Sequence, residues 1–262
     1  GFLLIAIGLA YTPIWPADIL HFYGFYFLVA AALIKANDRG LLIAATVAMA
    51  LFPMMMFIFD YEHGWDWNTL TYHGFWTLDG MIRHILFNGF HPVFPWCAFL
   101  LLGMWLGRQN LSERTVRNRL LTLSATIWVI TEAAFFAAKI LLKNYNVLDI
   151  TTEELEFLFS TSIIPPLPQY IIAAGSLAVV IIICCLNFGQ KFSGSKLAIW
   201  LNQTGQLSLT LYVAHVIIGM ATLEAIGKLE NQTIECSLIS TFIFSASGVI
   251  FSVLWLKYFK TG

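Results

Sequence analysis

The hydrophobic residues of this chain come in long runs, and the polar residues gather between the runs. About 20 mostly apolar residues are needed to cross a membrane as a helix. The runs predict one partial span at 1–11 and seven full spans at 19–35, 40–59, 93–107 with its upstream shoulder, 118–139, 166–187, 207–226 and 236–257. The predicted fold is therefore all-α, a polytopic integral membrane helical bundle that forms one transmembrane domain over residues 1–262.

Composition favours the same class of protein. The chain is 59% hydrophobic and 11% charged, whereas a soluble domain has about a quarter charged residues. A net charge of −1 gives no basic patch for nucleic acid. The four cysteines show no zinc-ligand spacing, so we expect them to pack as small apolar residues and expect no metal. The first residue lies inside an apolar run, so we expect further helices upstream.

The lysines and arginines predict the orientation of the spans. If the first loop lies in the cytoplasm and the spans alternate, ten of the 14 basic residues fall inside and four outside. The positive-inside rule favours this arrangement. It places loops 36–39, 108–119 and 188–206 in the cytoplasm, and loops 60–92 and 140–165 on the extracytoplasmic side.

The longest outer loop, 60–92, is rich in aromatic and imidazole side chains. It carries four of the six histidines and three tryptophans: His63, His73, His84, His91, Trp65, Trp67 and Trp76. A loop of this length is usually functional or disordered, and this one is too aromatic for disorder. Its tryptophans could stack on sugars or form an aromatic belt at the membrane surface.

An ionisable side chain, His215, stands in the middle of the predicted span 207–226. Ser208, Tyr212, His215, Gly219 and Thr222 are spaced to share one helix face. We therefore expect the imidazole to face the protein interior or a wet cavity. Ionisable residues at this depth indicate function, but an interhelical hydrogen bond of about 1 kcal/mol is the open alternative.

A second candidate constellation is PADILHFYGFYF, residues 16–27, where Asp18 and His21 share a helix face near the outer surface. A carboxylate beside an imidazole fixes its tautomer and raises its basicity, as a general base requires. The alternative, which the spacing by itself favours, is that Asp18 caps the start of a helix.

Polar and small residues around the span 93–107 suggest further roles. His91 and Trp96 flank an irregular, proline-containing entrance to this span, where freed backbone groups need protein or water partners. Gly103 and Gly107 form a G-x-x-x-G pattern that predicts close helix packing. Arg108 could bind a phosphate or anchor the cytoplasmic end of the span.

Glu132 lies in the outer half of the span 118–139. We expect it to line the same cavity as His215. Lys139 is seven residues further on, about 10 Å along a helix axis, so the two should not pair directly.

Three stretches together resemble one family. They are PADILHFYGFYFLVAAALI (16–34), IRHILFNGFHPVFPWCAFLLLGMWLGR (82–108) and TGQLSLTLYVAHVIIGM (204–220). In order and spacing they are similar to bacterial inner-membrane proteins related to heparan-alpha-glucosaminide N-acetyltransferase, in the transmembrane acyltransferase superfamily. The second stretch is the most specific. The third resembles the S-L-Y-L-x-H helix of the superfamily, here Ser208 to His215.

This resemblance implies transfer of an acyl group, expected to be acetyl, from cytoplasmic acyl-CoA to an extracytoplasmic hydroxyl or amine on a sugar-like acceptor. It implies that the main catalytic histidine of the family lies upstream of Gly1. His215 becomes a supporting pocket residue, with Asp18, His21 and His91 as outer-site candidates. Since a thioester is already activated, the site needs mainly a base and an oxyanion donor. We expect substrate contacts from Tyr212, Glu132, Trp96 and Arg83, and a contact between Arg108 and the acyl-CoA phosphates.

Two other functions stay open. A proton-coupled transporter or flippase of a small polar or lipid-linked solute could use His215, Glu132 and Asp18 as a proton relay, although no internal repeat of the kind found in transporters is visible in the sequence. A non-catalytic membrane partner is the third possibility. The lipid bilayer and a sugar-like acceptor are the expected partners, a homodimer is one candidate assembly, and the acyl group and acceptor are left open.

Overall fold

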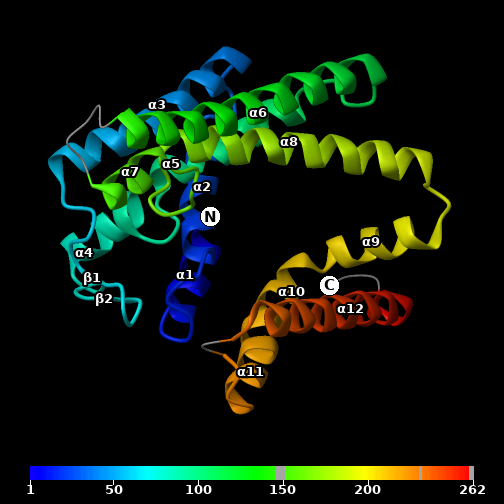
Figure 1. Cartoon of the computed structure of the whole chain (residues 1–262). Helices are drawn as coiled ribbons and strands as arrows, with labels where there is room; N and C mark the ends of the chain where they lie inside the picture. The colour runs from blue at the N-terminus through cyan, green and yellow to red at the C-terminus, as the bar shows by residue number, and fades with distance from the viewer. Residues whose placement is uncertain (146–150, 230–231, 260–262) are drawn as a thin grey trace. The chain divides into compact units, whose positions relative to one another are not determined.

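The computed structural model describes residues 1–145, 151–229 and 232–259, and their regular structure is almost entirely helical (Figure 1). Contacts within the chain divide it into two compact units, Gly1–Ile183 and Cys184–Gly262. Each unit is described by itself.

Unit 1 contains most of the helices. They are α1 (Phe2–Tyr11), α2 (Leu20–Ala32), α3 (Asp38–Ile58), α4 (Leu78–Arg83), the π-helix η1 (His84–Asn88), α5 (Val93–Gly107), α6 (Arg114–Tyr145), α7 (Thr152–Phe159) and most of α8 (Pro168–Lys191). A two-stranded antiparallel hairpin pairs β1 (Trp65–Asp66) with β2 (Thr71–Tyr72). Unit 2 holds α9 (Lys196–Gln206), α10 (Ser208–Ala214), the π-helix η2 (His215–Met220), α11 (Ala221–Ala225) and α12 (Ile234–Tyr258).

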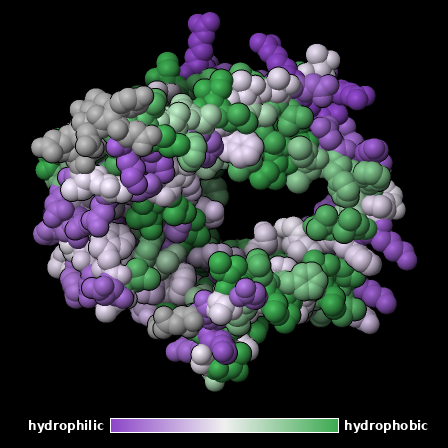
Figure 2. All heavy atoms as spheres, viewed as in Figure 1, coloured by the Kyte–Doolittle hydropathy of each residue, from purple (hydrophilic) through white to green (hydrophobic). Residues whose placement is uncertain are grey.

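Five helices in the described ranges are long and apolar enough to cross a membrane: α3, α6, α8, the continuous segment Ser208–Ala225 and α12. A sixth is reached if Leu78–Asn88 and Val93–Gly107, which meet at a bend of 49°, form one span. Hydrophobic residues cover the middle of the long helices and hydrophilic ones gather toward their ends (Figure 2). The chain is therefore a helical, multi-pass membrane protein. The predicted count of seven full spans is not confirmed, because α2 has only 13 residues.

Polar side chains fix where three of the helices begin. The Asn37 side chain accepts a hydrogen bond from the Gly40 amide (2.7 Å) at the start of α3. Ser195 and Thr233 cap α9 and α12 in the same way. Each cap satisfies a backbone amide that the first helical turn leaves without a partner.

Small residues bring α1 and α2 together. A Cβ atom added to Gly8 would lie 2.2 Å from the His21 amide nitrogen, and one added to Gly24 would lie 2.4 Å from Ile5 Cγ1. The close packing predicted at Gly103 and Gly107 is not observed, because no described atom lies within 4 Å of a Cβ added at either position. The close helix approach therefore occurs between α1 and α2 and not at the glycines of α5.

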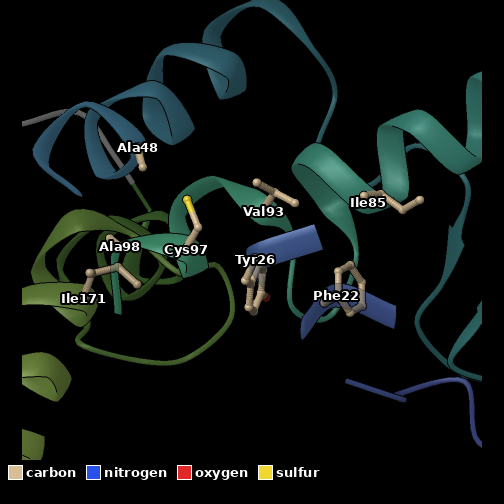
Figure 3. Close-up of a cluster of buried hydrophobic side chains, with 8 residues drawn as sticks. All are labelled: Phe22, Tyr26, Ala48, Ile85, Val93, Cys97, Ala98 and Ile171. Carbon is tan, nitrogen blue, oxygen red and sulfur yellow. The ribbon is translucent and has the colours of Figure 1, made fainter. Parts of the chain in front are cut away.

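The main core of unit 1 forms where α2, α3, η1, α5 and α8 meet. Phe22 and Tyr26 of α2 are buried together with Ile85, Val93 and Cys97 from η1 and α5 (Figure 3). Phe22 is completely buried, and its ring also lies beside the histidines described below. The same packing that stabilises the helices therefore positions the candidate site.

Candidate functional site

The centre of the site is a completely buried carboxylate and imidazole where α2 begins. Asp18 Oδ2 lies 3.0 Å from His21 Nδ1, and both side chains are 0% exposed. The same oxygen accepts hydrogen bonds from the backbone amides of Leu20 and His21 at 3.0 and 3.2 Å. The N-cap residue of α2 is Ile19, but the Asp18 carboxylate satisfies two amides at the start of the helix and also orients the imidazole.

The geometry of this pair leaves one imidazole nitrogen available. When Nδ1 of His21 donates to Asp18, Nε2 keeps its lone pair and can accept a proton. That nitrogen has no hydrogen-bond partner among the described residues. Gly8 makes room for the pair, since a Cβ at this position would lie 2.8 Å from Asp18 Oδ2.

Two further histidines lie around Phe22, of which His84 is buried and His91 is partly buried. The ring centre of His84 is 6.0 Å from that of His21 and 5.4 Å from that of Phe22. His91 lies 6.0 Å from Phe22, and its carbonyl accepts a 2.5 Å hydrogen bond from the Tyr26 hydroxyl. Nδ1 of His84 and Nδ1 of His91 have no partner in the described part of the chain. No group of His, Cys, Asp or Glu in that part is arranged to hold a metal ion.

A cavity of about 490 Å³ lies beside His84. One wall comes from the turn between α1 and α2, and the other comes from the β1–β2 hairpin and the residues that follow it. Its lining includes Thr12, Pro16, Trp65, Tyr72, Phe75 and His84. The predicted outer loop is therefore an ordered aromatic structure that covers an imidazole.

Asn88 fastens this aromatic hairpin to η1. Its Nδ2 donates to the carbonyls of Tyr61 and His63, both at 2.9 Å, and its Oδ1 accepts from the Tyr72 hydroxyl at 3.0 Å. Its own carbonyl accepts from Trp65 Nε1 at 2.5 Å. Burial raises the pKa of Tyr72, which keeps the phenol protonated as the donor. Sequence reasoning missed Asn88, although a lone amide inside the apolar run ILFNGF was an available signal.

The two predicted substrate residues nearest this site have different surroundings. Trp96 packs against His91 with 4.7 Å between ring centres, and its Nε1 is buried without a partner among the described residues. Arg83 lies on α4, where its guanidinium pairs with Asp79 at 2.9 Å. Trp96 thus joins the histidine cluster, whereas Arg83 is engaged by a neighbour one helical turn away.

Arg108 clamps the connection between α2 and α3. Its guanidinium donates to the carbonyls of Ile34 (3.0 Å) and Ala36 (2.6 Å), and it lies 3.4 Å from Asp38 Oδ1. These bonds join the end of α5 to the α2–α3 connection, and both the cytoplasmic anchoring and the phosphate binding stay predictions.

Glu132 accepts a 2.9 Å hydrogen bond from the Thr161 hydroxyl. Lys139 pairs with Glu156 of α7 at 2.9 Å, which agrees with the expectation that Glu132 and Lys139 do not pair directly. The prediction that Glu132 shares a cavity with His215 joins residues of two units, and it stays a prediction.

In unit 2, His215 begins η2 and lines a cavity of about 1060 Å³. Its Nδ1 hydrogen-bonds to the carbonyl of Tyr212, and its ring centre lies 5.2 Å from that of Tyr212. Gly219 and Thr222 line the same cavity, whereas Ser208 and Tyr212 are not among its described lining residues. Of the predicted polar face, His215, Gly219 and Thr222 therefore line the cavity, and Tyr212 packs against His215.

The fold and the site define a multi-pass membrane protein with a buried imidazole cluster. Residues 16–147 match the family described as heparan-alpha-glucosaminide N-acetyltransferase, catalytic, and residues 106–262 match the family described as protein of unknown function (DUF418). The chain belongs to these overlapping families, which confirms the resemblance to proteins related to heparan-alpha-glucosaminide N-acetyltransferase. Comparison with curated proteins and with solved structures gave no match. Asp18, His21, His84 and His91 lie within the acetyltransferase match.

Proposed function

We propose that the protein is a membrane-embedded acyltransferase. It moves an acyl group, in the simplest case acetyl, from cytoplasmic acyl-CoA to a hydroxyl or amine of an extracytoplasmic, sugar-like acceptor. The observation that carries the proposal is the buried Asp18–His21 pair, whose Nε2 has no partner among the described residues, inside the acetyltransferase match. A carboxylate-backed neutral imidazole is a competent general base.

The proposed reaction needs acyl-CoA, the acceptor and an imidazole of this chain, and no further reactant. The acceptor's O–H or N–H gives its proton to an imidazole, and its oxygen or nitrogen attacks the thioester carbonyl. A new C–O or C–N bond forms as the C–S bond breaks, and sulfur leaves with the electron pair. The imidazolium then protonates the thiolate, which leaves as CoA thiol. Asp18 stabilises the imidazolium between these steps.

We also propose on which side of the membrane each substrate binds. The positive-inside rule supports a cytoplasmic 108–119 loop and an extracytoplasmic aromatic hairpin. Arg108 is occupied by the carbonyls of Ile34 and Ala36. The exposed side chains of Arg114 and Arg119 are therefore better suited to attract the CoA phosphates.

Proton-coupled transport is the second candidate function. One observation favours it: the helices Leu78–Asn88 and Val93–Gly107 meet at a 49° bend, and broken helices are typical of transporters. A transporter would move its solute without consuming a thioester.

The test uses the purified protein in liposomes with acetyl-CoA and a panel of amino sugars and neutral sugars. We expect acceptor-dependent release of CoA thiol. His21→Asn should abolish that release, while His63→Asn should keep it, because His63 is an exposed histidine whose main chain alone contacts Asn88. Proton-driven uptake of a solute, with no thiol release from any acceptor, would refute the acyltransferase and establish transport.

A further inference from the structure

The cavity beside the hairpin reaches one histidine of the cluster but not the carboxylate-backed one. His84 is among the residues that line it, whereas His21 is completely buried and is not one of the described lining residues. An acceptor bound in this cavity therefore meets His84 first. The Asp18–His21 pair can act on that acceptor only through another group.

The surroundings of His84 hold its ring in a fixed orientation. Tyr72 and Phe75 contact it edge-on, with ring centres at 4.8 and 4.9 Å. On the other side, a Cβ added to Gly89 would lie 2.9 Å from Nδ1 of His84, so only a glycine fits there. The side chain begins a π-helix, a distortion found frequently at functional sites.

This fixed orientation does not give Nδ1 of the imidazole a hydrogen-bond partner. His84 is 2% exposed, and its Nδ1 has no hydrogen-bond partner among the described residues. A buried polar group left without a partner is destabilising. The ring centre of His21 lies 6.0 Å away at an angle of 25° between ring planes, and Nε2 of His21 is also without a partner in the described chain. At this separation one water can bridge a nitrogen of each ring.

We propose that His84 is the catalytic residue that takes the proton from the acceptor and relays it to His21. One nitrogen of neutral His84 accepts the proton while its other nitrogen gives one up, through a single water, to Nε2 of His21. Asp18 holds the resulting imidazolium. The proton returns by the same path when the thiolate leaves, so both histidines end the cycle neutral. This inference rests on the proposed acyltransferase function and deepens it.

The experiment is chemical rescue of thiol release with exogenous imidazole. His84→Ala leaves a ring-sized space on the cavity wall, which free imidazole can enter from the cavity. We expect turnover to fall about 10²- to 10⁴-fold, the usual contribution of a general base, with the KM for acetyl-CoA unchanged. Imidazole should restore turnover in a saturable way. His21→Ala should lose turnover without rescue, because its site is not on the cavity wall.

A second variant separates the relay from packing. His84→Asn keeps most of the side-chain volume but cannot carry a proton, so it should lose turnover while its melting temperature stays near that of the wild type. Absence of thiol release by the wild type itself would refute the proposed function rather than the relay. With an active wild type, the relay is overturned by turnover within about threefold of wild type in His84→Asn, or by a folded His84→Ala that imidazole does not rescue.

Discussion

Replacement of Asn88 by alanine should destabilise the protein more than any other single amide change in the outer loop. The Asn88 side chain is 0% exposed and makes three hydrogen bonds, to the carbonyls of Tyr61 and His63 and from the hydroxyl of Tyr72. Each such bond contributes about 1 kcal/mol net, and removal of one partner leaves the other unsatisfied. The expected loss in the free energy of unfolding is therefore about 3 kcal/mol.

The assay is thermal unfolding in detergent, followed by intrinsic tryptophan fluorescence. For a chain of this size, 1 kcal/mol corresponds to about 2–4 °C in Tm, so Asn88→Ala should melt roughly 6–12 °C below the wild type. The matched control is Asn68→Ala, an exposed amide in the same loop, which should shift Tm by no more than about 1–2 °C. Equal shifts in the two variants would show that the Asn88 side chain does not hold the hairpin in place.

Three other changes test separate parts of the structure. Gly8→Ala would put a Cβ 2.2 Å from the main chain of α2 and should cost about 1–3 kcal/mol in thermal unfolding, whereas Gly103→Ala, with nothing within 4 Å, should not lower Tm. Arg108→Ala removes two bonds to carbonyls and should cost about 1–2 kcal/mol, with exposed Arg114→Ala as the silent control. Because burial raises the pKa of Tyr72, the stability that this residue contributes is present below about pH 10 and lost above it. Tyr72→Phe should therefore make Tm less sensitive to pH between about 9.5 and 11, and an unchanged pH dependence would contradict this.

The long helices could be predicted from the sequence because apolar run length and polar caps act locally. The predicted span 236–257 corresponds to the helix Ile234–Tyr258, and 40–59 corresponds to Asp38–Ile58. The shorter α7 and α9 were missed, since neither contains an apolar run of spanning length. The π-turns at His84 and His215 also have no signature in the apolar pattern.

The candidate site could be predicted only where its contacts are close in sequence. Asp18 and His21 are three residues apart, so helix periodicity brings them together. Asn88 and Tyr61 are 27 residues apart, and their contact depends on how the hairpin folds back onto η1. The proposed proton relay from His84 to His21 likewise depends on the packing of α2 beside η1. No local sequence pattern predicts that packing.

Glycine patterns likewise do not show which helices pack closely together. A G-x-x-x-G pattern specifies a helix face that can be approached closely, but not whether a partner approaches it. At Gly103 no described atom comes near, whereas isolated Gly8 packs against the start of α2. The partner helix decides which small residue matters.

The central claim is that this chain uses acyl-CoA, and the most direct test is binding of acetyl-CoA to the purified protein by calorimetry, with free CoA as the comparison. We expect saturable binding, and we expect His215→Ala to weaken it because the His215 side chain lines the cavity of unit 2. Failure of the well-folded protein to bind any acyl-CoA would contradict the acyltransferase account.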